Sequence, residues 1–114
     1  MNKTIVKKSK IPNAGRGVFA TQNIKKGEII EKIEIIPISK QEVNHILVTT
    51  LGYYHYEFKD HYAIALGHGS LYNHNKENPN ADAFDSKRHL LMKAIKNIKK
   101  GEEITFNYGY EINK

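Results

Sequence analysis

The sequence predicts a mainly β fold with one or two short helices. β-Branched and aromatic residues are concentrated in short runs along most of the chain, and polar turns containing glycine separate those runs. Only one stretch combines a signal for a helix N-terminus with an apolar stripe at helical spacing. These two observations favour mixed β structure with little helix, arranged as several short sheets.

The expected strands are the β-branched and aromatic runs, and the longest of them is the isoleucine-rich run at residues 29–38. One of these runs groups Tyr53, Tyr54, Tyr56 and Phe58 in a single strand. The predicted strands cover residues 4–6, 18–20, 29–38, 53–58, 62–66, 89–95 and 103–108.

The expected helix begins after Ser39, because Ser39 and Glu42 have the spacing of a capping box. Its apolar stripe consists of Val43, Ile46 and Leu47. Gly52 marks the end of this helical region. A second, shorter helical turn is expected near residues 70–74.

One segment of the sequence is repeated almost letter for letter. Residues 23–30 read Asn-Ile-Lys-Lys-Gly-Glu-Ile-Ile, and residues 97–104 read Asn-Ile-Lys-Lys-Gly-Glu-Glu-Ile. Two copies do not make a repeat fold, which needs at least three units. Each copy is instead typical of a polar turn that leads into a strand. Its glycine stands where the turn needs a backbone conformation that other residues rarely adopt. We therefore expect two equivalent strand entries.

Length and composition predict one domain spanning residues 1–114. The absence of cysteine excludes a disulfide framework, a thiolate zinc site and a cysteine nucleophile. A formal charge of +6, from 18 Lys and Arg against 12 Asp and Glu, indicates association with polyanions or a nucleoprotein. A lysine-rich, solubilising surface is the alternative interpretation. No basic stretch alternates with aromatics, so nucleic acid is expected as a companion of the substrate rather than as the ligand, and direct binding stays open.

Neither a membrane anchor nor a metal site is expected from the sequence. No apolar run approaches the roughly 18 residues of a membrane span, and the first ten residues lack the apolar core of a signal peptide. We expect a cytoplasmic protein, or a nuclear one if it is viral or otherwise delivered to a host. The six histidines form no pair at metal-ligand spacing with a carboxylate, so scattered surface or core histidines are expected.

Three motifs stand in order along the chain. Residues 15–20 read Gly-Arg-Gly-Val-Phe-Ala, residues 71–74 read Leu-Tyr-Asn-His and close on Pro79-Asn80, and residues 101–109 read Gly-Glu-Glu-Ile-Thr-Phe-Asn-Tyr-Gly. Each motif alone is weak, but together they resemble the signature of the SET domain. Within that family, the chain is most similar to the small stand-alone SET proteins of viruses and bacteria, which lack a Cys-rich C-terminal zinc cluster.

The resemblance implies a β-clip fold with a C-terminal pseudoknot-like threaded segment. It also implies a protein-lysine N-methyltransferase that uses S-adenosyl-L-methionine and acts on a basic protein, such as a histone-like, ribosomal or other nucleoprotein. A non-catalytic β-clip module of the SAF type is the alternative, because residues 18–30 also resemble those domains. Such modules need neither the Asn73-His74 pair nor Tyr108 in its motif.

The family's cofactor-binding positions fall on the first two motifs and the tail. The resemblance implies that Asn73 holds the amino-acid end of the cofactor and that the backbone of His74 meets the adenine. Gly15 and Gly17 would let backbone groups approach the methionine carboxylate, with Arg16 alongside. Tyr110 is expected to pack over the cofactor. An Asn amide suits a zwitterionic ligand because it both donates and accepts hydrogen bonds.

The family's catalytic tyrosine matches Tyr108. Because its hydroxyl has an ordinary pKa near 10, it is a poor base at neutral pH, and we assign it the orientation of the amine and methyl group. Tyr54 matches a second catalytic tyrosine, and Tyr54, Tyr56, Phe106 and Tyr108 are the expected walls of the lysine channel. Which of Tyr53, Tyr54 and Tyr56 lines the channel stays open, since a one-residue shift exchanges the faces of a strand.

Two further expectations concern the product and the assembly. SET enzymes with Phe at the position of Phe106 tend to make di- or trimethyl-lysine, so multiple methylation is expected. Few residues follow Tyr108, so we expect either a homodimer, whose partner covers the active site, or closure of the site by substrate. Tyr110 and Ile112 are the expected packing residues of the tail.

Overall fold

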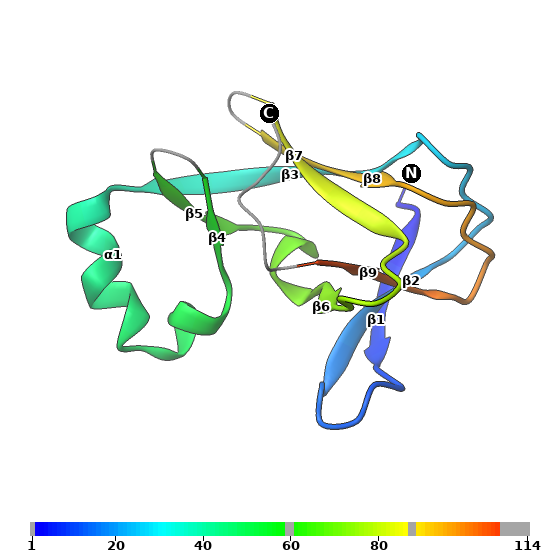
Figure 1. The fold of residues 1–114 in the computed structure, drawn as a ribbon, viewed down its shortest axis with the longest axis horizontal. Coiled ribbons are helices and arrows are strands. Elements are labelled where there is room, and N and C mark those ends of the chain that lie inside the picture. Colours follow the sequence, from blue (N-terminus) through cyan, green and yellow to red (C-terminus); the bar gives the residue numbers. More distant parts are fainter. Residues whose placement is uncertain (1, 59–60, 87–88, 108–114) are drawn as a thin grey trace.

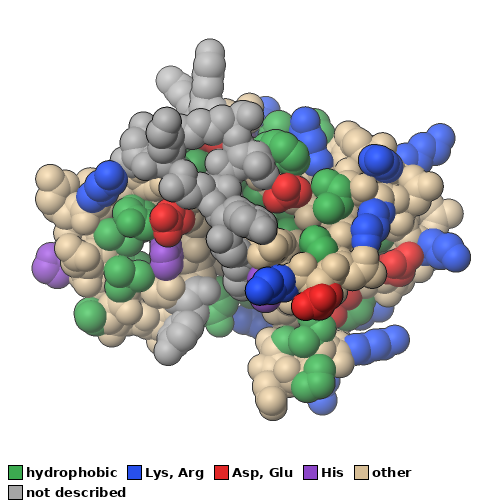
Figure 2. Space-filling model, viewed as in Figure 1, with side chains coloured by type: hydrophobic (Ala, Val, Ile, Leu, Met, Phe, Trp, Pro, Cys, Tyr) green, Lys and Arg blue, Asp and Glu red, His purple; other side chains and the backbone are tan. Residues whose placement is uncertain are grey.

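The computed structural model describes residues 2–58, 61–86 and 89–107, without the side chain of Tyr53. The strands among these residues form two curled sheets (Figure 1). In the view of Figure 1, the α-helix α1 lies at the left end and the two turns that precede β3 and β9 lie at the right end. Side chains of Lys and Arg gather at that right-hand end (Figure 2).

The first sheet has the order β1-β2-β9-β6. Strands β1 (Thr4–Lys8), β2 (Arg16–Ala20) and β9 (Glu103–Phe106) pair antiparallel, whereas the short β6 (Asn73–His74) runs parallel to β9. This order brings the three sequence motifs into one sheet, because β2, β6 and β9 each carry one of them.

The second sheet has the order β4-β5-β3-β8-β7 and is antiparallel throughout. Its central strand is the isoleucine-rich run expected from the sequence. Its strands are β3 (Ile29–Ile38), β4 (His55–Glu57), β5 (Tyr62–Ala65), β7 (Ala81–Ser86) and β8 (His89–Ala94). The pairing of β3 with β8 shifts register between Ile29 and Glu31. Because this bulge resets the alternation, Ile30 and Ile33 are both buried although they lie three residues apart.

The capping box predicts the helix start correctly. Helix α1 (Lys40–Leu47) begins after Ser39, whose side chain accepts a hydrogen bond from the Glu42 amide, while the Glu42 carboxylate accepts one from the Ser39 amide. Of the expected apolar stripe, only Val43 is fully buried. The expected short turn is the 3₁₀ helix η2 (Gly69–Leu71).

Two strand predictions need correction. The aromatic run at residues 53–58 is not one strand, because the Thr49 hydroxyl caps a 3₁₀ helix, η1 (Thr50–Tyr53), and only β4 is extended. Strand β7 was not expected, because alanine and aspartate are depleted in strands, yet it pairs with β8 along its whole length. The expected strand at residues 103–108 is described to Phe106, and the C-terminal segment that was expected to be threaded lies outside the described residues.

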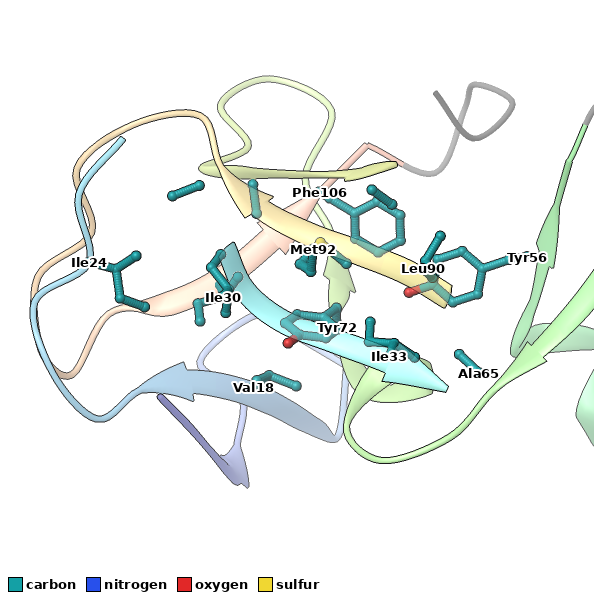
Figure 3. Packing of buried hydrophobic residues seen from close by; sticks show 14 of the residues in the cluster. Val18, Ile24, Ile30, Ile33, Tyr56, Ala65, Tyr72, Leu90, Met92 and Phe106 are labelled. Atoms are coloured by element: carbon teal, nitrogen blue, oxygen red, sulfur yellow. The ribbon is translucent and has the colours of Figure 1, made fainter. Parts of the chain in front are cut away.

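One apolar cluster joins the two sheets (Figure 3). Alternate residues of β8, including Leu90 and Met92, are fully buried, as expected for a strand with one face on the core. They pack with Val18 from β2, Ile33 from β3 and Ile104 from β9 in the same cluster. Each such side chain contributes roughly 1.5–3 kcal/mol by leaving water. The core therefore holds β2 and β9, which carry two of the motifs, against the larger sheet.

Candidate active site

Asn73 lies where the three motifs meet, and its orientation is fixed by two acceptors. Its Nδ2 donates to the carbonyl oxygen of Arg16 at 2.9 Å and to Oε2 of Glu103 at 2.8 Å. A carbonyl and a carboxylate only accept hydrogen bonds, so the amide nitrogen of Asn73, and not its oxygen, must face them. In the described part of the chain, Oδ1 of Asn73 has no hydrogen-bond partner, and it is the atom available to a ligand.

Glu103 is held by neutral donors. The buried Ser9 hydroxyl lies 2.8 Å from Oε1 and 3.0 Å from Oε2 of Glu103, and Asn73 supplies the other hydrogen bond. The Ser9 oxygen in turn accepts a hydrogen bond from the Ile11 amide at 3.0 Å. No cationic side chain among the described residues forms an ion pair with Glu103. The carboxylate charge therefore stays uncompensated beside Asn73 and favours a positively charged ligand group there.

The two glycines of the first motif have different roles. A Cβ built on Gly17 would lie 2.3 Å from Oε2 of Glu103 and 3.0 Å from Nδ2 of Asn73, so only glycine leaves room for this pair. Gly15 has a φ of +73°, which favours glycine, and a Cβ there would meet no atom within 4 Å. The space beside Gly17 is thus filled by protein groups, and only Gly15 has open space beside it.

The Pro-Asn pair of the second motif secures strand β9. The Asn80 side chain donates through Nδ2 to the Glu103 carbonyl at 2.8 Å and accepts through Oδ1 from the Thr105 amide at 2.9 Å. These are the bonds that a neighbouring strand would make. On the other side, β6 pairs Asn73 with Thr105 and His74 with Phe106. Asn80 therefore fixes the strand that carries both Glu103 and Phe106.

A small pocket opens beside Asn73. Its lining comes from the start of the first motif, the residue after η1, the turn η2 and the second motif, and consists of Ala14, Arg16, Tyr54, Ser70, Leu71, Tyr72 and Asn73. Tyr54 is 39% exposed. Tyr72 is buried, and its hydroxyl donates to Oε1 of Glu31 at 2.6 Å. Burial, and secondly the Glu31 charge, raise the pKa of Tyr72 well above its usual value, so this hydroxyl remains protonated.

Tyr56 and Phe106 form a separate aromatic pair in the core (Figure 3). Their rings are stacked with centroids 5.6 Å apart and planes 7° apart, and both side chains are buried. The Tyr56 hydroxyl donates to the Gly69 carbonyl at 2.5 Å. Phe106 follows Thr105 on β9, next to the residue that pairs with Asn73, whereas Tyr56 lies on β4 of the other sheet.

The structure brings together Arg16, Gly17 and Asn73 of the motifs with Tyr54, which was expected in the lysine channel. Gly15 and His74 do not line the pocket, and His74 is exposed on β6. Tyr54 and Tyr56 separate, one to the pocket and the other to the core, because Tyr54 follows η1 rather than extending β4. Tyr108, Tyr110 and Ile112 lie outside the described residues.

No group of three or more metal-ligating side chains occurs within residues 2–58, 61–86 and 89–107. Over the same residues, no helix has the length and apolar character needed to cross a membrane.

The arrangement of β2, β6 and β9 around Asn73 has counterparts among known proteins. The family model of the SET domain matches residues 15–109 of the chain. The chain belongs to the SET-domain family. This confirms the family identified from the three motifs, and the mainly β SET fold is confirmed with it.

Relatives of this SET domain are named as lysine methyltransferases. The chain is 32% identical over 116 residues to the N-lysine methyltransferase KMT5A-A of Danio rerio, with 87% of this chain and 33% of that protein covered. It is 33% identical over 99 residues to the H3 lysine-37-specific histone-lysine N-methyltransferase of Schizosaccharomyces pombe, with 83% and 67% covered. This SET domain thus spans about a third of the length of the KMT5A-A protein that it matches.

Solved structures have the same fold. A protein from Plasmodium falciparum, provisionally described as a histone methyltransferase, superposes with a TM-score of 0.79 at 35% identity and 96% coverage of both chains. A structure of ctPRC2 in an autoinhibited conformation, bound to S-adenosylmethionine, superposes with a TM-score of 0.73, covering 95% of this chain and 15% of that one. Its identity of 23% makes it evidence for the fold alone.

Sequence reasoning gave no role to Glu103, Ser9 or Tyr72 in this SET domain. The position of Glu103 could have indicated a role, because glutamate is uncommon in strands and its carboxylate there needs a hydrogen-bond partner. Ser9 carried none, because its contact with Glu103 joins residues 94 positions apart. Tyr72 adjoins the Asn-His pair, but its partner Glu31 is 41 positions away and is placed by the bulge in β3.

Proposed function

We propose that this SET domain transfers methyl groups from S-adenosyl-L-methionine to the side-chain amine of lysine in a basic protein. The observation that carries the proposal is the orientation of Asn73, whose Oδ1 is available beside the uncompensated carboxylate of Glu103. An acceptor next to a negative charge suits an ammonium group, and the methionine end of the cofactor carries one.

Residues of the Asn73 pocket would hold the cofactor. Asn73 would accept from its ammonium, and Arg16, which is exposed and lines the same pocket, would attract its carboxylate. The open space beside Gly15 leaves room for backbone groups of the 14–16 segment to approach that carboxylate. When bound, the cofactor supplies an electrophilic methyl group on a positive sulfur. Tyr54 would cover part of the pocket, and the roles of His74 and Tyr110 stay predictions.

The protein must also supply a neutral lysine amine. Deprotonating a free lysine of pKa near 10.4 at pH 7 costs about 4.6 kcal/mol, at roughly 1.36 kcal/mol for each pH unit. Apolar, aromatic surroundings lower this cost because they disfavour the ammonium form. The stacked Tyr56 and Phe106 would supply such surroundings, and Phe106 lies on β9, which pairs with the strand of Asn73. Tyr108, two residues after Phe106 in the sequence, would orient the amine by a hydrogen bond.

Histone H3 is the first substrate to test, because the Schizosaccharomyces pombe relative is named as specific for lysine 37 of H3. The chain would be incubated with H3, with H4 as a second basic protein, and with cofactor carrying a labelled methyl group. We expect label on lysine, located by mass spectrometry. Its absence from every lysine of a broad panel of basic proteins would contradict the proposed activity.

The variant Tyr108→Phe tests the assignment of the reacting centre. It removes one orienting hydroxyl, so we expect about a hundredfold slower transfer, equivalent to about 3 kcal/mol. Binding of the cofactor should be unchanged, because the cofactor is held by the Asn73 pocket. Tyr62→Phe on β5 is the control. Normal turnover by Tyr108→Phe would move the catalytic role to another tyrosine.

A further inference from the structure

The two copies of Asn-Ile-Lys-Lys-Gly-Glu, at residues 23–28 and 97–102, pack against each other as a symmetric pair. Ile24 and Ile98 form an antiparallel bridge, in which the Ile24 amide donates to the Ile98 carbonyl at 2.8 Å and the reverse bond is 2.7 Å long. Both isoleucine side chains are only 1% exposed. The internal repeat is therefore a contact between two turns, and this contact places the two Lys-Lys pairs side by side.

The side chains of the asparagines connect the two turns reciprocally. Oδ1 of Asn97 accepts from the Lys26 amide at 2.9 Å, and Oδ1 of Asn23 accepts from the Lys100 amide at 2.9 Å. Both glycines of the pair, Gly27 and Gly101, have positive φ values, of 89° and 92°. Asparagine, isoleucine and glycine are thus each required by the geometry of the pair.

The glutamates are used within their own turns. Oε1 of Glu28 accepts from the Lys25 amide at 3.2 Å, and Oε1 of Glu102 accepts from the Lys99 amide at 2.8 Å. Every hydrogen bond to a lysine in the pair uses its backbone amide or carbonyl. Lys25, Lys26, Lys99 and Lys100 are exposed, and within the described residues their ammonium groups have no hydrogen-bond partner.

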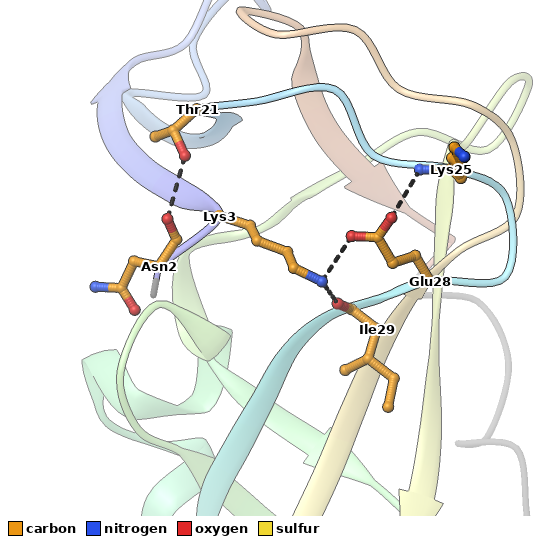
Figure 4. Close-up of polar contacts among 6 residues, drawn as sticks. All are labelled: Asn2, Lys3, Thr21, Lys25, Glu28 and Ile29. Carbon is orange, nitrogen blue, oxygen red and sulfur yellow. Dashed lines mark hydrogen bonds and ion pairs between the residues drawn. The ribbon is translucent and has the colours of Figure 1, made fainter.

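The local negative charge is largely committed elsewhere. The Lys3 ammonium lies 2.7 Å from Oε2 of Glu28 and donates to the Ile29 carbonyl at 2.6 Å (Figure 4). The hydrogen bond from Lys3, and then that from the Lys25 amide, lower the pKa of Glu28. Lys3 thus pairs with Glu28, which leaves Glu102 as the carboxylate of the turn pair without an ion pair to Lys3 or any other described lysine. The turn pair lies at the end where cationic side chains gather in Figure 2.

We propose that Lys25, Lys26, Lys99 and Lys100 form a binding surface for the phosphate backbone of a nucleic acid duplex. Lysine ammonium groups bind phosphate as point charges, without a fixed geometry. The twelve residues of the turn pair include no aromatic side chain, so they offer no platform for stacking single-stranded bases. Binding is therefore independent of sequence and dominated by the release of counterions.

The test compares two variants with the same net charge. The turn-pair variant carries Gln at residues 25, 26, 99 and 100. The control variant carries Gln in place of Lys8, Lys32, Lys40 and Lys76, which are exposed and lie on four other segments. Binding of a short fluorescent DNA duplex is measured by anisotropy over a range of salt concentrations, and thermal melts verify that both variants fold.

For the wild type we expect affinity that falls steeply with salt. The slope of log affinity against log salt should decrease by about 3 to 4 in the turn-pair variant, at about 0.9 for each phosphate that is no longer neutralised, and by less than 1 in the control. Equal decreases in the two variants would overturn the proposal, because net charge alone would then explain binding. Equally tight binding of poly-glutamate by the wild type would also overturn it, and so would the absence of duplex binding at low salt.

Discussion

At the scale of single residues, the site depends on how Glu103 fixes the amide of Asn73. With both amide hydrogens committed to Arg16 and Glu103, Asn73 can offer only its oxygen. The type of residue at position 73 could be predicted from the motif, but the free atom could not. Arg16 and Glu103 lie 57 and 30 positions from Asn73, and no local pattern shows that they converge there.

The variant Glu103→Gln should weaken binding of S-adenosylhomocysteine, the demethylated cofactor, about tenfold. It removes the negative charge beside Asn73 and one charge-assisted hydrogen bond, together about 1.4 kcal/mol. Glu102→Gln, at the exposed neighbouring position, is the control. Calorimetric titration should also show that an analogue without the amino group binds both variants equally. If Glu103→Gln weakened binding of that analogue to the same extent, the effect would be structural and the assignment wrong.

Phe106→Tyr should shift the product toward monomethyl-lysine. The added hydroxyl would occupy, or hold a water in, the space that a second methyl group needs. Phe106 is 5% exposed and stacked on Tyr56, so there is little room for rearrangement. Mass spectrometry of the product distribution is the measurement, with Phe84→Tyr on β7 as the control. A wild-type protein that makes only monomethyl-lysine during long incubation would contradict the multiple methylation on which this expectation rests.

At the scale of elements, the sequence predicts those helices, strands and turns that are fixed by interactions between nearby residues. The capping box, the isoleucine-rich β3 and the two strand entries could be predicted because their determinants lie within a few residues. Strand β7 could not, since its alanines and aspartates form a strand only through pairing with β8. The predicted strand start at residue 53 was wrong, because Thr49 caps the 3₁₀ helix η1 and residue 53 belongs to that helix. Tertiary pairing and a cap outside the run overrode strand propensity.

The bond between Tyr72 and Glu31 connects the second motif to β3, and Tyr72→Phe tests its contribution to stability. Removing the hydroxyl leaves Oε1 of Glu31 without this donor. The free energy of unfolding, measured with urea at pH 8, should therefore fall by about 1–3 kcal/mol. Tyr62→Phe, on a half-buried residue of β5, is the control and should change stability little. Equal effects of the two variants would mean that the bond contributes nothing specific.

The same variant should alter the response to alkaline pH. Because the folded state raises the pKa of Tyr72, the unfolded chain loses this proton first as the pH rises past about 10. The stability that Tyr72 contributes is therefore complete below about pH 10 and is lost above it. The free energy of unfolding of the wild type should thus decline more steeply above pH 10 than that of Tyr72→Phe. Parallel declines would contradict the raised pKa.

At the scale of the whole molecule, the homodimer stays a prediction. Apolar side chains are exposed at the end of α1 and in η1, where Leu47, Val48 and Leu51 are 49%, 84% and 47% exposed. A symmetric partner would bury this surface next to Tyr54 of the pocket. Light scattering should give twice the chain mass of 13.1 kDa, and Val48→Asp should give a monomer. A monomeric wild type at micromolar concentration would show that no partner covers the site.

The most direct test of the methyltransferase site is calorimetric titration of S-adenosylmethionine into the wild type, Asn73→Ala and Asn75→Ala. Asn75 is the matched control, because its side chain only caps the turn of residues 75–78. We predict one binding site in the wild type and in Asn75→Ala, and no detectable binding in Asn73→Ala, whose thermal melt should show a folded protein. Unchanged affinity in Asn73→Ala would contradict the site, and a wild type that binds no cofactor would instead favour a non-catalytic β-clip module.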